Sequence, residues 1–401
     1  MSQSTSEMKN SEIKKKKTKS LIRQTIIKIF LIALVLSPIL MYFVLSPLFY
    51  LYDPNEHAPW VSWFGNPESE VYLAWETEEK TAGTIKYGTE KDELSQSITE
   101  GKKTNIHHVN LTGLSSDTKY YYEVVIDGDV FGSGEFTTAP ASQKDFTFGF
   151  YSDTQQNLGP GHHFRIAKTF KDKKYSFVAN VGDIVQDGGK KEHYNNFFKI
   201  GSEYLGSIPF VPVIGNHDQR NMEQFTDYFI NKVNKSQNHF YYSFNWSNVH
   251  FTIPHFAYGS EPEMTDAQLN WLKKDLARAQ DKDFRIVMFH CPIIGASFFG
   301  PNELLIEKIQ PILLDSNVTA TIHGHEHHFE RGNIDGMTYI ISGGGGGALD
   351  IGLRPLPETE VLTESPNYTE VQVTKDEINF KTMTLEGEVI DDHTIKAEED
   401  N

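Results

Sequence analysis

The chain has 401 residues, a hydrophobic content of 38% and a formal net charge of −17, which together allow a globular protein of two domains. The charge is uneven, because residues 1–28 carry eight basic and two acidic side chains, a net of +6 that leaves −23 for the remainder. So acidic a body excludes general binding to nucleic acid. The single cysteine, Cys291, excludes an intramolecular disulfide. An acidic substrate would have to be attracted by local positive charge, such as a bound metal.

The N-terminal segment combines a basic tail, residues 1–28, with an apolar stretch, residues 29–52, that contains no charged side chain. This stretch is long enough to cross a bilayer. Because the positive charges precede it, we expect a single-pass signal anchor in the cell membrane, with a cytoplasmic N-terminus and an extracytoplasmic body. The alternative is a cleaved signal peptide and a secreted protein. The length of the stretch and the lack of an Ala-x-Ala-like site argue against cleavage.

After a short linker at residues 53–57, residues 58–140 are predicted to form an all-β domain. Val71, Leu73 and Trp75 alternate with other residues, which is typical of a strand with one buried face. Further strands are predicted around residues 84–88, 107–111 and 120–126, with a final hairpin near residues 127–134. The run from Leu114 to Val124 resembles the fibronectin type III pattern, with Tyr120 at the tyrosine-corner position. We therefore expect a fibronectin-like sandwich, followed by a second linker at residues 137–142.

From residue 145 to residue 390 strands and helices alternate, which predicts an α/β domain. Strands are predicted at residues 146–151, 175–181, 210–214, 285–289, 320–324, 337–342, 370–373 and 378–384, and as an antiparallel pair within residues 238–254. Helices are predicted at residues 162–171, 192–205 and 304–314, and a capping box at residues 265–268 begins another. The expected apolar face of the first helix consists of Phe164, Ile166, Ala167 and Phe170. The acidic tail from Asp391 is expected to be frayed.

Side chains that can bind metal follow five of these strands. They are Asp153, Asp183, Asn216, His290 and the pair His325 and His327. Parallel strands of one sheet bring their C-terminal ends to a single rim, so these residues are expected to converge. Carboxylate, amide and imidazole groups suit Zn, Mn or Fe, and a carboxylate can bridge two cations that clamp a phosphoryl displacement. A lone Asp or His there is an ordinary turn or core residue, but six in this order predict a metal centre.

These residues lie in a recognisable pattern: Asp153, Gly182-Asp183, Gly215-Asn216-His217-Asp218, His290 and Gly324-His325-Glu-His327. The pattern resembles the signature of the calcineurin-like metallophosphoesterases. The run from Gly324 to Arg331 and the preceding β domain are most similar to the purple acid phosphatase branch. The resemblance covers about residues 58–390, and it implies an αββα domain in which two mixed sheets lie between helices.

The resemblance also implies a role for each position. Asp183 would bridge two metals, Asp153 and His327 would bind the first, and Asn216, His290 and His325 would bind the second. His217 and Asp218 are the candidate catalytic residues. His217 would donate a proton to the leaving group while a metal-bound hydroxide attacks phosphorus in line, without a covalent intermediate. His217 could instead orient Asp218 or Asn216, but a group that titrates near neutral pH suits the acid role.

The chain departs from the family pattern around the first metal. Gln186 stands where purple acid phosphatases have a Tyr ligand, and Gln155 stands where many other members have His. Each glutamine is a possible ligand or a neighbour of the metal, and ferric iron is less favoured without the phenolate. Phe299 and Gly300 stand where the purple enzymes hold phosphate with histidines. The pocket is therefore expected to be more apolar there, and its substrate to differ.

We therefore predict a dinuclear metal-dependent phosphoric ester hydrolase that acts on phosphomonoesters or phosphodiesters. Its cofactors would be two divalent or mixed-valence ions of Fe, Zn or Mn. Its partners would be the ester and the lipid bilayer at residues 29–52. The alternative is a surface binding or adhesion module on the same fold that has lost turnover. Glu330 and Arg331 are expected to form an ion pair. The run Gly343–Gly347 is expected to be a flexible loop, since no Lys-Ser or Lys-Thr follows it to make a P-loop.

Overall fold

The structure is a computed structural model that describes residues 56–155, 161–229 and 240–397. The described residues belong to one compact unit. The predicted anchor at residues 29–52 and the basic tail before it lie outside them. In the described ranges, no helix combines the length and the apolar character needed to span a bilayer.

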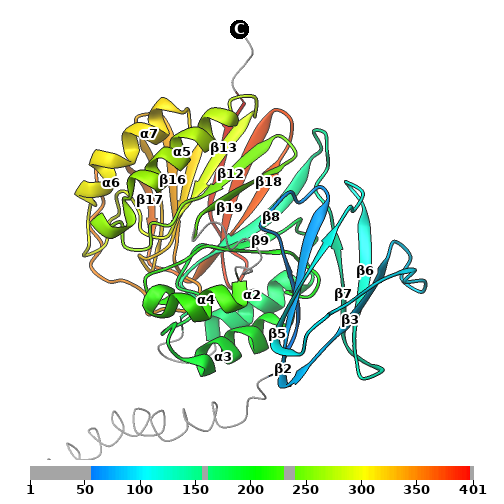
Figure 1. The fold of residues 1–401 in the computed structure, drawn as a ribbon. Coiled ribbons are helices and arrows are strands. Elements are labelled where there is room, and N and C mark those ends of the chain that lie inside the picture. The colour runs from blue at the N-terminus through cyan, green and yellow to red at the C-terminus, as the bar shows by residue number, and fades with distance from the viewer. Residues whose placement is uncertain (1–55, 156–160, 230–239, 398–401) are drawn as a thin grey trace, which may run out of the picture. The chain divides into compact units, whose positions relative to one another are not determined.

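The described part of the chain contains three β-sheets (Figure 1). In spatial order, the nine-stranded sheet consists of β20 (Val389–Lys396), β19 (Glu377–Thr384), β18 (Asn367–Val373), β8 (Phe146–Tyr151), β9 (Val178–Asn180), β10 (Phe210–Pro212), β1 (His57–Ser62), β2 (Glu70–Thr81) and β5 (Thr104–Thr112). The seven-stranded sheet consists of β11 (Tyr242–Trp246), β12 (Val249–Ile253), β13 (Phe284–Met288), β14 (Ala320–His323), β16 (Met337–Ser342), β15 (Phe329–Ile334) and β17 (Thr359–Thr363). The four-stranded sheet consists of β4 (Gln96–Thr99), β3 (Thr84–Gly88), β6 (Lys119–Ile126) and β7 (Asp129–Thr137).

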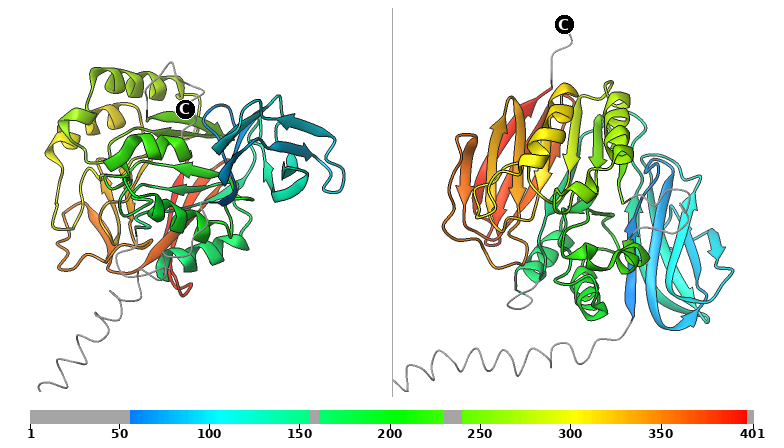
Figure 2. Two further views of the ribbon diagram at one scale, coloured as in Figure 1. Left: turned by 60° about the horizontal axis from the view of Figure 1, so that its bottom comes forward. Right: turned by 60° about the vertical axis from the view of Figure 1, so that its left-hand side comes forward.

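Helices cover the outer faces of the two large sheets (Figures 1 and 2). The nine-stranded sheet is covered by α2 (Gly161–Lys171), α3 (Lys191–Gly201) and α4 (Met222–Phe229), whose apolar side chains share one core with it. The seven-stranded sheet is covered by α5 (Asp266–Arg278), α6 (Glu303–Lys308) and α7 (Gln310–Asp315) in a second core. A third core lies between the sheets, where Phe148 of β8 meets Phe251 of β12. The predicted α/β domain with two mixed sheets is confirmed.

The N-terminal β domain shares a sheet with the α/β domain. Strand β1 pairs in parallel with β10, where Ser62 lies opposite Phe210. As a result both faces of β2 are buried: Leu73 packs inside the N-terminal domain, whereas Ala74 packs in the core under the helices. The expectation of a single buried face in β2 is therefore wrong, because its other face meets the α/β domain.

Three local expectations are also corrected. Phe164 is 39% exposed, and His163 takes the inner position of α2 instead, stacked on Phe197 at 5.1 Å. Positions 163, 166, 167 and 170 still give the i, i+3, i+4, i+7 stripe of an amphipathic helix. The predicted helix at residues 304–314 is divided between α6 and α7, and Pro311 lies in the first turn of α7. The C-terminal tail is ordered through Lys396, because β20 pairs with β19.

Candidate metal centre

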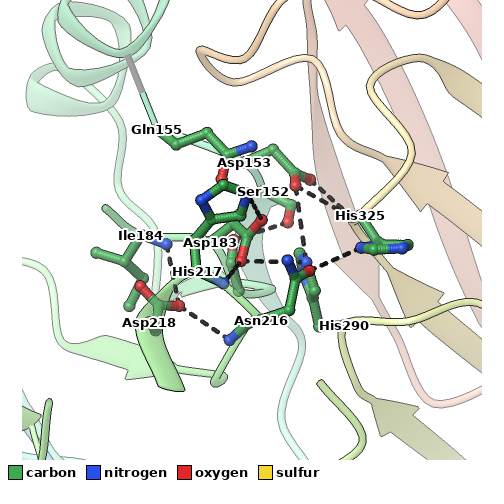
Figure 3. A network of polar contacts seen from close by, with 12 residues as sticks. Ser152, Asp153, Gln155, Asp183, Ile184, Asn216, His217, Asp218, His290 and His325 are labelled. Atoms are coloured by element: carbon green, nitrogen blue, oxygen red, sulfur yellow. Dashed lines mark hydrogen bonds and ion pairs between the residues drawn. The ribbon is translucent and has the colours of Figure 1, made fainter. Parts of the chain in front are cut away.

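The candidate ligands come from both large sheets rather than from one. Asp153, Asp183 and Asn216 follow the parallel strands β8, β9 and β10. His290 and His325 follow β13 and β14, which are parallel neighbours in the facing sheet. The five side chains nevertheless point toward one another (Figure 3). The expectation of one rim on one sheet is corrected: the C-terminal ends of parallel strands in two sheets meet here.

Two buried carboxylates and one imidazole form the middle of the centre. Asp153 and Asp183 are essentially inaccessible to solvent, as is His290. The Nε2 atom of His290 lies 3.4 Å from Oδ1 of Asp183 and 3.8 Å from Oδ1 of Asp153. One ligand atom from each of these residues lies within 4.8 Å of the other two, which is a spacing that allows all three to bind a single cation.

Main-chain carbonyl groups orient three imidazole rings of the site in the same way. The Nδ1 atoms lie 2.8 Å from Val181 O for His290, 2.7 Å from Ala348 O for His327 and 2.7 Å from Gln186 O for His217. A carbonyl oxygen only accepts hydrogen bonds, so each Nδ1 carries the hydrogen. Each Nε2 is therefore the basic atom, the arrangement that orients histidine ligands in metal sites.

The three Nε2 atoms point at the two buried carboxylates. Beside the His290 contacts, Nε2 of His327 lies 3.5 Å from Oδ1 of Asp153. The Nε2 of His217 lies 3.9 Å from Oδ2 of Asp183. The buried Nε2 of His290 has no hydrogen-bond partner in the described part of the chain. Because buried polar atoms are normally paired, this nitrogen fits a ligand, and the donor set fits Zn, Mn or Fe.

Asn216 and His325 are the remaining candidate ligands, and they contact each other. The Oδ1 of Asn216 lies 2.8 Å from Nδ1 of His325, and the N–H of His325 donates to the carboxylate of Asp153 at 3.0 Å. Asp153, Asp183 and His325 all have positive φ, at 58°, 51° and 70°. Left-handed backbone costs free energy for residues other than glycine and tends to occur at functional sites. The strained positions thus include three of the candidate ligands.

The electrostatic field of the centre favours positive charge. Burial alone would lower the pKa of His290, but Asp183 and Asp153 raise that pKa to about 10. Burial is likewise outweighed at His327, where the contact with Asp153 raises the pKa to about 9. Burial would raise the pKa of Asp183, yet His290 and His217 hold it below its ordinary value. A cation would satisfy the same carboxylates while the imidazoles act as neutral ligands.

The two glutamines lie where the departure from the family pattern placed them. The amide nitrogen of Gln155 is 3.0 Å from Nε2 of His327, and that of Gln186 is 3.3 Å from Nδ1 of His217. The amide oxygen of each is buried without a hydrogen-bond partner among the described residues. Gln155 therefore borders His327 and Gln186 borders His217, and their predicted place as metal ligands or neighbours stays a prediction.

Asp218 holds two loops of the site together, and its predicted catalytic role stays a prediction. Its carboxylate is buried and accepts hydrogen bonds from the main-chain N–H groups of Ile184, Val185 and Gly215, at 3.2, 3.1 and 2.9 Å. Burial and the neighbouring carboxylate of Asp183 raise its pKa, and the three N–H groups oppose that rise. Asp218 thus joins the loop after β9, which carries Asp183, to the loop after β10, which carries Asn216.

Asp350 is a residue of the site that the sequence analysis missed. Its carboxylate accepts the main-chain N–H of His327 at 2.8 Å and lies 3.4 Å from Nδ1 of His328. The only signal was its place shortly after the run Gly343–Gly347. That run is packed rather than flexible, which corrects the expectation. A Cβ on Gly345 would lie 2.2 Å from Ser152 O, and one on Gly347 would lie 2.3 Å from the His327 ring.

Behind the ligands lies a second buried cluster, Glu326, His328 and Glu330. Glu330 lies 3.1 Å from Nε2 of His328 and accepts the hydroxyl of Tyr339 at 2.8 Å. Arg331 instead pairs with Asp391 on β20. The expected ion pair between Glu330 and Arg331 is therefore wrong, because neighbouring residues of strand β15 point to opposite faces.

Comparison with known proteins gives consistent matches. The Calcineurin-like phosphoesterase family matches residues 146–329, and the Purple acid Phosphatase, N-terminal domain family matches residues 59–148. Purple acid phosphatase 18 from Arabidopsis thaliana is 24% identical over 74% of this chain and 74% of that protein. Tartrate-resistant acid phosphatase type 5 from Mus musculus is 28% identical over 45% of this chain and 64% of that protein.

A solved structure shares the fold. Purple acid phosphatase PPD1 from yellow lupin seeds superimposes with a TM-score of 0.72 at 15% identity, covering 86% of this chain and 75% of that chain. The two family matches follow one another in the order of the two domains seen here. Residues 146–329 therefore form a calcineurin-like metallophosphoesterase domain, and residues 59–148 form a purple acid phosphatase N-terminal domain before it. Together with the acid phosphatase relatives, these matches support a dinuclear metal-dependent phosphoesterase.

Proposed function

We propose that this chain hydrolyses phosphate esters at two cations, with Asp183 between them. Asp153 and His327 would hold the first, and Asn216, His290 and His325 the second. The observation that carries this assignment is the shared orientation of His290 and His327, each with Nδ1 on a main-chain carbonyl and Nε2 toward the buried carboxylates. When bound, the cations would supply Lewis acidity that activates water and neutralises charge on the phosphoryl group.

In this proposal His217 is the residue that protonates the leaving group. Its Nδ1 is held by Gln186 O, so Nε2 is the atom that exchanges a proton with the ester oxygen. Its side chain is 19% exposed, which leaves an edge of the ring open to a substrate. Its main-chain N–H donates to Asp183 at 2.8 Å, which ties the acid to the proposed bridging carboxylate. A general acid placed in this way contributes about 10²- to 10⁴-fold to the rate.

The inactive binding module is the weaker alternative. Its only support was the pair of glutamines near the first metal. Gln155 contacts His327 there, and both glutamine oxygens remain available on that side. Neither the structure nor the comparisons favour loss of turnover.

The test is hydrolysis of an aryl phosphate and an aryl phosphodiester by the purified chain, with Mn, Zn or Fe added and with a chelator as control. We expect turnover that the chelator abolishes. In His217→Ala we expect kcat to fall by about 10²- to 10⁴-fold while both metals stay bound. In Asn216→Ala we expect loss of one metal together with activity.

The matched control is His393→Ala, which removes a half-buried histidine from β20. We expect it to keep wild-type activity. No turnover with any metal by folded protein would contradict the proposal and favour the binding module. Equal losses in His393→Ala and His217→Ala would show that the effect is not specific to the site.

We also propose that the body is extracytoplasmic and anchored through residues 29–52. The support is the sequence: an uncharged apolar stretch that follows a basic tail. Digestion of intact cells with an external protease should remove the phosphatase domain and leave the N-terminal tail protected. A mature protein that begins after residue 52, measured by mass, would instead indicate a cleaved signal peptide.

We further propose that the N-terminal β domain is a fibronectin type III-like sandwich. Strands β1, β2 and β5 supply one sheet and the four-stranded sheet supplies the other, with an apolar core between them. The Tyr120 hydroxyl accepts the N–H of Ser115 at 2.9 Å, and this contact with the preceding main chain supports the tyrosine-corner position proposed for Tyr120. A crystal structure with a different strand order in these sheets would contradict this.

A further inference from the structure

Exposed apolar side chains gather on two segments next to the candidate metal centre. Among the described residues, the three most exposed large apolar side chains are Phe298, Ile351 and Phe299, at 99%, 86% and 63%. Single exposed apolar residues are ordinary, but a group of them beside a site marks a binding surface. Phe298 and Phe299 belong to the segment after β13, and Ile351 follows Asp350.

Both segments contact histidines of the centre. The ring of Phe299 lies 4.7 Å from the ring of His325, and Phe298 lies 6.3 Å from Phe299. The second segment is joined to His327 by two hydrogen bonds, from His327 N–H to the Asp350 carboxylate at 2.8 Å and from Asp350 N–H to His327 O at 3.1 Å. The ring of Phe299 thus borders His325, and the residue before Ile351 is hydrogen-bonded to His327, so the two segments adjoin the histidines of both proposed cations.

The segment that carries the phenylalanines is held in place by the second buried cluster. The carboxylate of Glu330 accepts the N–H of Ala296 at 2.8 Å, and that of Glu326 accepts the N–H of Ser297 at 3.0 Å. A Cβ on Gly295 would lie 2.3 Å from the Glu326 carboxylate, so only glycine allows this approach. The N–H of Arg354 donates to Ala296 O at 2.7 Å and joins the two segments. The two segments that carry the exposed apolar side chains are therefore held in place before any ligand binds. Such preorganisation lowers the entropic cost of binding a ligand.

We propose that Phe298, Phe299 and Ile351 form an apolar rim that selects phosphate esters of large apolar alcohols. This inference rests on the proposed phosphoesterase function. A phosphoryl group at the centre must direct its ester chain out of the site, and on the side of His325 and His327 that chain meets the rim. Burial of the chain against the rim adds binding energy that a small polar ester cannot gain. The rim side chains determine specificity and take no part in the proton transfer.

The test is a series of n-alkyl phosphates from propyl to octyl, because their leaving groups have nearly equal pKa and differ only in apolar area. All are assayed as dissolved monomers with the metal that gives turnover. For the wild-type chain we expect kcat/KM to rise by about two- to fourfold per methylene until the rim is covered. For the triple variant Phe298→Ala, Phe299→Ala, Ile351→Ala we expect this dependence on chain length to disappear. Metal content is measured in parallel, because Phe299 touches a ligand.

The matched control is Phe164→Ala, which removes an exposed phenylalanine that lies on helix α2 under Lys168. It should keep the wild-type dependence on chain length. Turnover without any such dependence in the wild type, or a dependence that survives in the triple variant, would overturn the rim but leave the hydrolase intact. A dependence of kcat/KM on chain length that appears only when the long esters aggregate would also overturn the rim. The side chains Phe298, Phe299 and Ile351 would then bind a lipid surface rather than a single ester. No turnover of any ester would overturn both inferences.

Discussion

Two buried clusters of histidine and carboxylate groups lie in this domain, and they differ in the partners of their histidine nitrogens. In the cluster of Asp153, Asp183 and His290, the Nε2 of His290 has no hydrogen-bond partner in the described residues. In the cluster of Glu326, His328 and Glu330, both ring nitrogens of His328 lie near carboxylates, at 3.1 Å from Glu330 and 3.4 Å from Asp350. Similar residue types thus serve a metal centre in one place and a scaffold in the other.

The difference has a physical cause. Glu330 accepts hydrogen bonds from Tyr339, Thr359 and Ala296 in addition to its contact with His328. A carboxylate with so many donors is stabilised without a cation. The residues around His290 mainly place hydrogen-bond acceptors next to one another. A positive charge between them would therefore stabilise this arrangement. The unpaired nitrogen of His290 is therefore explained by a ligand, whereas the donors around Glu330 hold loops in place.

The largest effect is expected from Asp183→Asn, which removes the proposed bridging carboxylate and keeps its shape. The carboxamide has only one acceptor oxygen and no charge, so it cannot bridge two cations. We expect kcat/KM to fall by more than about a thousandfold, with loss of metal measured by elemental analysis. Wild-type metal content and activity in this variant would contradict the role of Asp183.

The next largest effect is expected from Glu330→Gln, and it should appear in stability rather than in metal binding. Burial would raise the pKa of Glu330, but hydrogen bonds from His328, Thr359 and Tyr339 hold it below its ordinary value. Breaking a buried pair of this kind costs about 3 kcal/mol. Urea unfolding of chelator-treated protein measures the change. Unchanged stability with loss of a bound metal would show that the two clusters have been assigned the wrong way round.

Asp218→Asn should have a smaller effect, because Asp218 positions the ligand loops without touching the substrate. The substitution replaces one carboxylate oxygen with an NH2 group. This NH2 group would face main-chain N–H groups, and two donors cannot form a hydrogen bond with each other. Loss of such outer contacts typically costs 10- to 100-fold, and we expect this in kcat/KM with both metals retained. A pH–rate profile that loses one limb in this variant would instead make Asp218 a catalytic group.

The smallest effect is expected from a polar cluster that shares no residue with the metal centre. Burial would raise the pKa of Asp275, but hydrogen bonds from His250, Ser243 and Thr252 lower it. A lowered pKa means that the carboxylate stabilises the fold above its unfolded-state pKa of about 4, and that this stabilisation is lost as pH falls through the lower folded value. Asp275→Asn should cost about 1–2 kcal/mol at pH 7 and almost nothing in strong acid. Urea unfolding at the two pH values tests this, and an equal loss at both would contradict it.

The sequence predicted what depends on local pattern. Strands β8 and β16 begin and end at the predicted residues, and the predicted ligands Asp153, Asp183 and His290 do gather. Their convergence from two sheets could not be read from strand ends alone, because it depends on how the sheets stack. The inner position of His163 escaped prediction because a neutral imidazole between aromatic rings packs like an apolar residue.

Contacts distant in sequence account for the other differences. Strand β20 was missed because its acidic residues suggest a free tail, yet Arg331 binds Asp391 there. The two buried faces of β2 depend on the pairing of β1 with β10, which joins residues far apart in the chain. The role of Asp218 follows mainly from the N–H groups of Ile184 and Val185 on the loop after β9, which no local motif displays.

The most direct measurement is the metal content of the wild-type chain, Asp183→Asn and Glu330→Gln, after loading with Mn, Zn or Fe and removal of free metal. We expect two equivalents in the wild type and in Glu330→Gln, and fewer than one in Asp183→Asn. A wild-type content of one equivalent or none, or a loss of metal in Glu330→Gln with none in Asp183→Asn, would contradict the assignment of the dinuclear centre.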